Sequence, residues 1–296
     1  MKLNVLDYLK KDIDISSLSN FKTQAKTKYY YEIHNRQDLD KLLEIYNFSM
    51  EHKLKILLIG GGTNLLFAFD LFDGIIVKNC LKGYKYDDNS KILEVYTSEF
   101  ISDVSKELYE KGQILWKRFI GLPGSFGGAI YGNAGCFGLE TESNFVSCEV
   151  FDFSQGSIDT FSKDEMNFEY RSSKIKNTNN YFIISALFDL STLKEKYSSD
   201  VDNIYFREHK QPKGNSCGSF FKNPSKENSA GKLIEQVGLK GRKIGGAYFS
   251  ELHANFLISD GTATYSDLLE LIKLAKNEVY NKYDIELIPE VRIITN

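Results

Sequence analysis

The chain has 296 residues, of which 42% are hydrophobic and 26% charged, and its formal net charge is −3. This length favours two or three lobes over one small core, and the balance of charge gives no sign of a nucleic-acid partner. The first residues hold no apolar run of signal-peptide length, and no stretch approaches the ~20 apolar residues that span a bilayer. We therefore expect a cytoplasmic protein with no membrane partner.

The cysteines and histidines are scattered along the chain. No two cysteines form a C-x-x-C pair, and the histidines lie far apart in sequence. The residues are Cys80, Cys136, Cys148, Cys217, His34, His52, His209 and His253. This spacing predicts neither a metal site nor a disulfide framework.

The first two thirds of the chain carry alternating helix and strand patterns. In the first of them, Leu39, Leu42, Leu43 and Tyr46 recur at helical spacing. The predicted elements are a helix at 36–52, strands at 55–59 and 74–77, a helix at 99–111, and strands at 146–153 and 181–189.

A change of composition marks the last third of the chain. Residues 191–217 are polar and charged, which predicts a domain boundary near 190–200. Helices are expected at 229–237 and 265–282, the second opening with the capping-box pair Thr264 and Asp267. A strand over 285–294 ends the chain.

A glycine motif directly follows the strand at 55–59. Its residues are Gly60, Gly61, Gly62, Thr63 and Asn64. Consecutive glycines let backbone N–H groups turn toward an anion such as a phosphate. The spacing matches neither the Rossmann nor the P-loop pattern, and a tight turn between strand and loop explains the motif equally well.

A second glycine-rich segment covers residues 121–138 and holds seven of the 22 glycines without any charged residue. Such a backbone-lined wall suits the diphosphate and the isoalloxazine ring of a flavin. A surface loop is the alternative, but Phe126, Ile130 and Tyr131 favour burial. The candidate cofactor residues are Gly121, Pro123, Gly124, Ser125, Gly127, Gly128, Asn133 and Gly135.

Three further positions have side chains suited to catalysis. Arg171, beside Tyr170, can hold a carboxylate with two hydrogen bonds. Ser219 stands between a glycine and two aromatic residues. The G-x-S-x-G elbow of hydrolases is absent, so a nucleophilic serine is not supported. The hydroxyl of Ser219 can instead donate a proton. Glu290 follows Pro289, which places it at the edge or entry of a strand. A surface arginine, a turn serine and a solvent-facing ion pair are the respective alternatives.

The order of these motifs resembles one enzyme family. GGGTNLL, GLPGSFGGAIYGNAGCFG, YRSS, GSFFKNP, AGKLIEQVGLKG, IGGA, HANFLI and PEVR follow one another over residues 55–296, as in the UDP-N-acetylenolpyruvoylglucosamine reductases. GSFFKNP and PEVR are the most specific of these motifs. The absence of longer insertions between 215 and 264 resembles the compact second subclass of that family.

The resemblance implies an α+β fold with an FAD-binding region of the vanillyl-alcohol-oxidase type, also called PCMH-type. It implies two FAD-binding lobes in residues 1–194, a substrate-binding domain in 195–285, and a C-terminal strand, 286–296, that returns to the FAD-binding region. The cofactor would be non-covalent FAD, and NADPH the reductant. A monomer is the working expectation, since no pattern indicates an oligomer.

The resemblance also assigns roles to particular residues. Arg171, Ser219 and Glu290 match the catalytic trio, and Lys210 and Asn223 match positions that contact substrate. We add Tyr170 as a candidate substrate contact because it adjoins Arg171. The reaction implied is the reduction of UDP-N-acetylglucosamine enolpyruvate to UDP-N-acetylmuramate.

One segment departs from the family pattern, and two rival functions stay open. Residues 20–26 lack the glycine pair common near the N-terminus of the family, so no FAD contact is assigned there. A flavin oxidase of alcohols or sugars would share the FAD segments without needing GSFFKNP and PEVR. A flavin- or nucleotide-binding module without catalysis would not need Arg171, Ser219 and Glu290.

Overall fold

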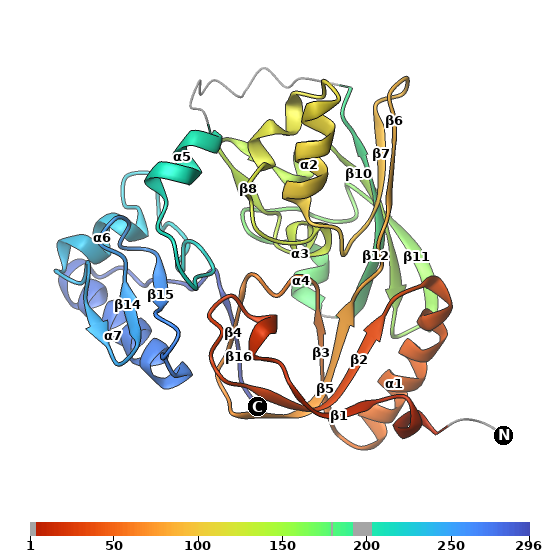
Figure 1. The fold of residues 1–296 in the computed structure, drawn as a ribbon, viewed down its shortest axis with the longest axis horizontal. Coiled ribbons are helices and arrows are strands. Elements are labelled where there is room, and N and C mark those ends of the chain that lie inside the picture. The colour runs from red at the N-terminus through yellow and green to blue at the C-terminus, as the bar shows by residue number, and fades with distance from the viewer. Residues whose placement is uncertain (1–3, 179, 192–202) are drawn as a thin grey trace. The chain divides into compact units, whose positions relative to one another are not determined.

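The computed structural model describes residues 4–178, 180–191 and 203–296 (Figure 1). The chain divides into two compact units. Unit 1 consists of Met1–Lys10, Tyr29–Gly61 and Gly74–Arg207, and unit 2 of Lys11–Lys28, Gly62–Asp73 and Glu208–Asn296. The chain therefore passes between the units several times. The predicted boundary at 194/195 lies outside the described residues, and the predicted division stays a prediction.

Unit 1 is built on a five-stranded antiparallel sheet. Its order is β11-β10-β12-β7-β6. The strands are β6 (Tyr84–Asp87), β7 (Ile92–Tyr96), β10 (Phe145–Asp152), β11 (Ser157–Ser162) and β12 (Tyr181–Asp189). Helices α2 (Ile101–Glu110) and α3 (Phe126–Tyr131) lie beside this sheet (Figure 1) and share one core with it. In that core the rings of Trp116, Phe126 and Phe188 contact one another.

A second sheet has the order β1-β2-β5-β3, and β3 and β5 run parallel. Its strands are β1 (Lys10–Asp14), β2 (Lys26–Ile33), β3 (Lys55–Ile59) and β5 (Leu71–Asn79). Helix α1 (Leu39–Glu51) connects the sheet's strands β2 and β3, and it buries Leu39, Leu42 and Ile45 in the same core as Ile75 and Val77 of β5.

Short elements complete unit 1. They are the α-helix α4 (Lys174–Thr178), the 3₁₀ helices η1 (Val5–Asp7), η3 (Arg36–Asp38), η4 (Leu115–Phe119) and η5 (Thr141–Ser143), and the hairpin strands β8 (Gly135–Cys136) and β9 (Leu139–Glu140). Helix α5 (Asn203–Lys210) begins in unit 1 and ends in unit 2.

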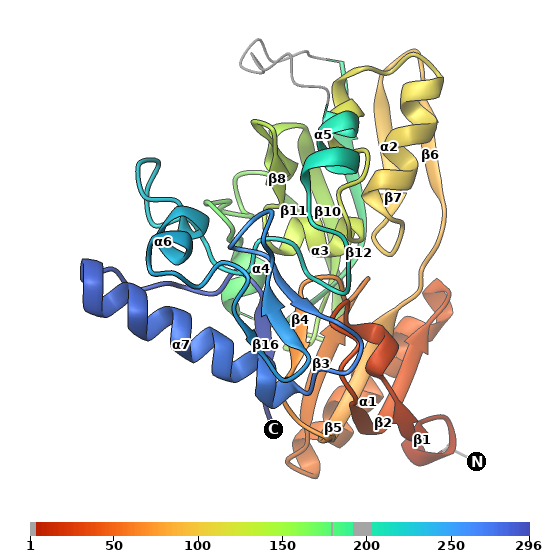
Figure 2. The same ribbon diagram turned by 60° about the vertical axis from the view of Figure 1, so that its left-hand side comes forward.

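Unit 2 packs helix α7 (Tyr265–Tyr283) on a small antiparallel sheet (Figure 2). The sheet strands are β13 (Lys243–Ile244), β14 (Ala247–Phe249) and β15 (Leu257–Ser259). The other elements of unit 2 are η2 (Ser16–Leu18), β4 (Leu65–Phe67), α6 (Ala230–Gln236) and β16 (Arg292–Ile294). The start of α7 is the predicted one, because the side chains of Thr264 and Asp267 each accept a hydrogen bond from the other's backbone N–H.

The pattern-based helices and strands are confirmed, with one correction. The C-terminal strand is shorter than expected: β16 covers only Arg292–Ile294, where it pairs in parallel with β4. Pro289 has no backbone N–H to donate to a ladder, and the chain before β16 makes only single bridges, such as Phe221 with Pro289. The predicted strand over 285–294 was therefore wrong in extent.

No helix among the residues that the structure describes combines the length and apolar composition needed to cross a membrane.

Asn255 ties two chain segments together inside unit 2. Its side chain is buried, donates to the carbonyl of Phe221 over 2.8 Å and accepts from the N–H of Phe221 over 2.9 Å. Its own carbonyl accepts from the N–H of Phe220 over 2.7 Å. Phe220 and Phe221, the two residues that follow Ser219, are therefore both held by hydrogen bonds to Asn255.

Replacing Asn255 by Ala is expected to destabilise the protein strongly. The change leaves the buried N–H and C=O of Phe221 without partners, at a cost of about 1–3 kcal/mol each. The free energy of unfolding, measured by denaturant titration, should therefore fall by about 2–6 kcal/mol.

The matched control for this experiment is Asn281→Ala, at an exposed position on α7. Its unfolding free energy should stay within about 0.5 kcal/mol of the parent value. Equal effects of the two substitutions would contradict the role given to Asn255.

Candidate functional site

In unit 1 the two glycine motifs lie against each other. Ser125 caps the start of α3, and its Oγ accepts hydrogen bonds from the N–H of Gly61 over 3.3 Å and of Gly128 over 3.4 Å. A Cβ at Gly60 would lie 2.5 Å from that Oγ, and one at Gly61 would lie 3.3 Å from the backbone nitrogen of Ser125. The two segments meet only because glycines occupy these positions.

This glycine cradle fits the FAD implied by the motifs. Its walls are backbone, so N–H groups can approach a diphosphate without side-chain bulk. Gly127 is also confined, since a Cβ there would lie 3.2 Å from the carbonyl oxygen of Thr97. Gly124 is buried, whereas Gly121 and Pro123 are exposed on the same loop.

The second part of the GGGTN motif belongs to unit 2. Gly62 has a φ of +69°, and a Cβ at this position would lie 1.9 Å from the carbonyl oxygen of Leu18. Only glycine fits there. Asn64 donates through Nδ2 to the carbonyl of Glu290 over 3.1 Å, and its own carbonyl accepts from the N–H of Arg292 over 3.0 Å. Thr63, between them, is partly buried.

Arg171 is bound to the glycine-rich segment of unit 1. It lies in a turn closed by backbone hydrogen bonds between Glu169 and Ser172, with a φ of +57°. Its Nη1 donates to the carbonyl of Asn133 over 3.3 Å, and its Nη2 to that of Gly135 over 3.0 Å. The structure thus joins a predicted catalytic residue to two predicted cofactor residues.

Asn133 and Tyr170 complete this region of unit 1. The side chain of Asn133 is buried, donates to the carbonyl of Glu169 over 3.1 Å and accepts from the N–H of Glu142 over 3.1 Å. The amide of Asn133 therefore fixes the turn that carries Arg171. Tyr170 is half exposed, and its ring centre lies 5.0 Å from the guanidinium carbon of Arg171.

In unit 2, Glu290 is hydrogen-bonded to Phe220, the residue that directly follows Ser219. The N–H of Glu290 donates to the carbonyl of Phe220 over 2.8 Å. Phe220 is itself fully buried in the unit 2 core, next to Phe221 and Phe21. The predicted proton donor and the predicted acid therefore flank one fixed peptide.

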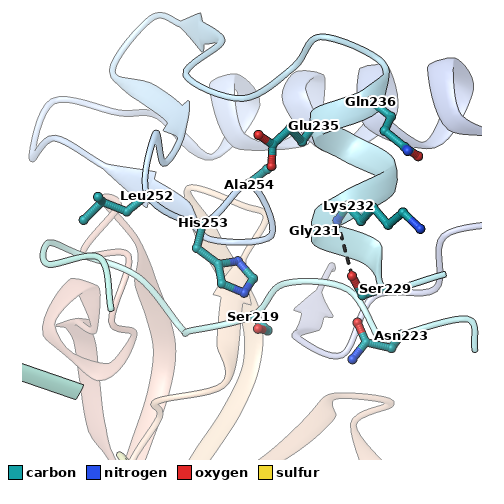
Figure 3. A pocket seen from close by; sticks show the side chains of 10 residues that line it. All are labelled: Ser219, Asn223, Ser229, Gly231, Lys232, Glu235, Gln236, Leu252, His253 and Ala254. Atoms are coloured by element: carbon teal, nitrogen blue, oxygen red, sulfur yellow. Dashed lines mark hydrogen bonds between the residues drawn. The ribbon is translucent and has the colours of Figure 1, made fainter. Parts of the chain in front are cut away.

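Ser219 and Asn223 line a pocket of about 340 Å³ in unit 2 (Figure 3). The other lining residues are Ser229, Gly231, Lys232, Glu235, Gln236, Leu252, His253 and Ala254. Asn223 accepts from the N–H of Ala230 through Oδ1, which orients its amide. The hydroxyl of Ser219 has no hydrogen-bond partner among the described residues. Lys210 is exposed at the end of α5 and is not a lining residue.

His253 is a pocket residue to which the sequence gave no role, although it begins the HANFLI motif. Its Nδ1 accepts from the N–H of Asn255 over 3.2 Å, so a neutral His253 carries its proton on Nε2. Figure 3 shows the ring directed toward Ser219. His253 can thus donate a hydrogen bond to a ligand in the pocket.

Two cysteines near these motifs are protonated at neutral pH. Burial raises the pKa of the Cys217 thiol to about 12. Burial also raises the pKa of Cys136, against the opposing influence of Arg207, Arg171 and Arg118. A thiol that keeps its proton is a poor nucleophile, so Cys136 is not prepared for covalent attachment of a cofactor.

A cluster in unit 1 was missed because its members lie far apart in sequence. Glu32, His34 and Cys80 place potential metal-ligand atoms within 4.8 Å of one another. The N–H of Cys80 donates to the carbonyl of Ile33, which brings the two segments together. Lys10 already pairs with Glu32 at 2.9 Å. The expectation of no metal site stays a prediction.

The comparisons with known proteins agree with this arrangement. Residues 34–162 match the sequence family of FAD-binding domains. Residues 210–294 match the family of C-terminal domains of UDP-N-acetylenolpyruvoylglucosamine reductase. UDP-N-acetylenolpyruvoylglucosamine reductases of Chlamydia abortus and Protochlamydia amoebophila are 32% and 34% identical to the chain. The alignments cover 97% and 95% of this chain and 94% and 92% of those proteins.

A solved structure supports the fold. The UDP-N-acetylenolpyruvylglucosamine reductase of Thermus caldophilus superposes with a TM-score of 0.75 over 97% of this chain and 100% of that one, at 22% identity. The predicted α+β fold with a vanillyl-alcohol-oxidase-type FAD-binding region is confirmed. FAD, for which the glycine cradle has the appropriate backbone walls, is the cofactor. By sequence, domain composition and fold, the chain belongs to the UDP-N-acetylenolpyruvoylglucosamine reductase family.

Proposed function

We propose that this protein reduces UDP-N-acetylglucosamine enolpyruvate to UDP-N-acetylmuramate, a step of peptidoglycan precursor synthesis, with NADPH as the reductant. The relatives carry this reductase name over nearly the whole chain. In this proposal residues 1–194 bind FAD, 195–285 bind substrate, and 286–296 complete the FAD-binding region. The enzyme acts as a cytoplasmic monomer.

The observation that carries the proposal is the state of Ser219. Its hydroxyl lines a pocket and has no partner within the described residues, while the adjacent peptide is held by Asn255 and Glu290. A serine whose backbone is fixed, and whose hydroxyl proton is not engaged in a hydrogen bond, is suited to general-acid catalysis. A serine that served only the turn would be expected to bond back to the chain.

The bound flavin supplies the hydride, which adds to C3 of the enolpyruvyl group. The electron pair of the double bond then moves to C2, and the carboxylate delocalises it as an enolate. Arg171 is always charged and stabilises that negative charge as it develops. Its hydrogen bonds to the carbonyls of Asn133 and Gly135 hold the guanidinium in position.

Ser219 then donates its proton to C2, which completes the addition of H⁻ and H⁺ across the double bond. The serine recovers its proton from solvent. A Glu290 that shares a proton with a neighbour helps to neutralise the enolate or orients the substrate carboxylate. The backbone bonds of Glu290 to Phe220 and Asn64 fix the position from which it acts.

Three residues are proposed to bind substrate. Lys210 provides a point charge for a phosphate, and Asn223 donates an amide hydrogen in the pocket that contains Ser219. Tyr170 contacts substrate beside Arg171. The polar pocket lining suits a nucleotide sugar, which carries hydroxyls and amides that require partners.

Ser219→Ala separates the two half-reactions. NADPH-driven bleaching of the flavin should stay close to the parent rate, because hydride transfer to the flavin uses no serine proton. Reoxidation by the enolpyruvyl substrate should slow by about 10²–10⁴-fold, the usual effect of losing a positioned general acid. Stopped-flow absorbance measures the two steps separately.

Ser266→Ala is the control, since Ser266 is exposed on the first turn of α7, and neither step should change. Reoxidation of Ser219→Ala within about threefold of the parent rate, well below the general-acid effect, would transfer the protonation to Glu290 or water. Similar slowing of both half-reactions would support the turn-residue alternative.

Lys210→Ala is expected to weaken substrate binding more than it slows flavin reduction, since Lys210 is proposed to contact a substrate phosphate. The dissociation constant for the enolpyruvyl substrate and the rate of bleaching by NADPH are the two readouts. Lys213→Ala, at a nearby exposed lysine, should alter neither. Equal losses in both half-reactions would argue against a dedicated substrate role for Lys210.

The purified protein is expected to release its FAD on acid denaturation. Burial keeps the Cys136 thiol protonated, so no covalent bond to the flavin should form. After precipitation the yellow colour should appear in the supernatant, measured by its absorbance. Colour that stays with the precipitated chain would show that the flavin is covalently attached.

A further inference from the structure

Arg207 lies in a fixed position against the glycine-rich segment of unit 1. Asn203, at the start of the same helix α5, is buried and donates to the carbonyl of Lys117 over 2.8 Å. Phe206 meets the ring of Phe137 edge-on at 5.8 Å. These contacts anchor the first half of α5 on residues 117–137.

The side chain of Arg207 fits between two residues of that segment. Its guanidinium carbon lies 5.2 Å from the ring centre of Phe137. Its Cδ occupies the space beside Gly121, where a built Cβ would approach it to 2.8 Å. The absence of a side chain at Gly121 therefore leaves room for the arginine stem, and Phe137 supports the guanidinium from its face.

Two nitrogens of Arg207 are buried without an acceptor. Nε and Nη2 are hidden from solvent and have no hydrogen-bond partner among the residues that the structure describes. Arg207 also forms no ion pair with a carboxylate of the described part of the chain. A buried donor that loses water without gaining a partner is unfavourable, so these two N–H groups are suited to an acceptor that a ligand supplies.

The two nitrogens indicate which kind of occupant fits. Nε–H and one Nη–H of a guanidinium point the same way and form a fork that holds two oxygens of one anion. Arg118 and Arg171 bind carbonyls of the same segment, those of Phe137 and Gly135, and so add positive charge. Three guanidinium groups thus contact residues of the 121–138 segment, which itself holds no charged side chain.

We propose that Arg207 binds a diphosphate through Nε and Nη2, at the glycine-rich segment of unit 1. The two phosphate sources are FAD and the UDP-sugar substrate. The second source rests on the proposed function, whereas the first rests on FAD binding alone. Neither the GGGTN motif nor the catalytic trio includes this residue.

The test uses the FAD-loaded enzyme and the variants Arg207→Gln and Arg207→Lys. Gln preserves much of the stem but removes the charge and the fork, and Lys keeps a charge without the fork. Retention of FAD is measured by ultrafiltration at increasing dilution. Binding of UDP-N-acetylglucosamine, which has the diphosphate but no enolpyruvyl carboxylate, is measured by calorimetry.

Both variants should weaken either FAD retention or UDP-N-acetylglucosamine binding by about 10- to 100-fold, as expected for lost hydrogen bonds to a charged group. The affected arm identifies the source of the diphosphate. Arg242→Gln, at an exposed arginine of unit 2, should change neither. Should Arg207→Gln lower the melting temperature, Arg207→Lys supplies the comparison in a folded protein.

Values within twofold of the parent protein in both arms would overturn the proposal. Weaker binding of the enolpyruvyl substrate alone would also overturn it, since the contact would then be to the carboxylate. If the parent enzyme binds FAD but neither binds the UDP-sugar nor reduces its enolpyruvyl ether, the proposed function fails. The FAD arm would still decide the role of Arg207.

Discussion

The peptide of Phe220 is the constraint on which the unit 2 site depends. Its N–H donates to Asn255 and its C=O accepts from Glu290, so two other segments fix one residue in the core. Because Phe220 is fully buried, neither bond can be exchanged for water at low cost. Ser219 is fixed because it precedes this residue, and Glu290 because it binds to it.

Hydrogen bonds of Asn64 link the PEVR motif to the GGGTN motif. Asn64 binds the carbonyl of Glu290 and the N–H of Arg292, and the parallel pairing of β16 with β4 continues from there. A substitution at Asn64 would therefore disturb the segment that leads from Glu290 into β16 as well as a glycine motif. The GGGTN, GSFFKNP, HANFLI and PEVR motifs are thus joined by backbone and side-chain hydrogen bonds within unit 2.

Local sequence patterns predicted the longer helices and several of the strands, because the signals of these elements lie in nearby residues. The capping box of Thr264 and Asp267 and the apolar positions of α7 are contained within the helix itself. The length of the strand predicted at 285–294 was wrong because a strand needs a partner to pair with. The partner β4 pairs only with Arg292–Ile294. The sequence patterns did not predict helix α3, because Gly127 and Gly128 are weak helix formers. The N-cap residue Ser125 was the one local signal for it.

The candidate site was only partly accessible from the sequence for the same reason. Motifs identified Arg171, Ser219 and Glu290, but not the bonds that hold them, which join residues far apart in the chain. Arg207 gave no sequence signal, because its significance lies in two nitrogens without acceptors and in the ring of Phe137 beneath it. The three-residue cluster around Glu32 depends likewise on pairing of distant segments.

The distribution of charge explains why a serine is a suitable proton donor for the proposed reaction. Hydride addition creates a negative charge on the substrate, and an ionised carboxylate in the place of Ser219 would repel it. A carboxylic acid would donate only if burial raised its pKa above neutrality, whereas the half-buried Ser219 is neutral without any such shift. The cost is that a serine alkoxide is strongly basic, so the proton must be replaced from solvent as it leaves. In the proposed reaction the two tasks are therefore separate: Arg171, which stays charged at any physiological pH, would stabilise the enolate, and the neutral hydroxyl of Ser219 would protonate it.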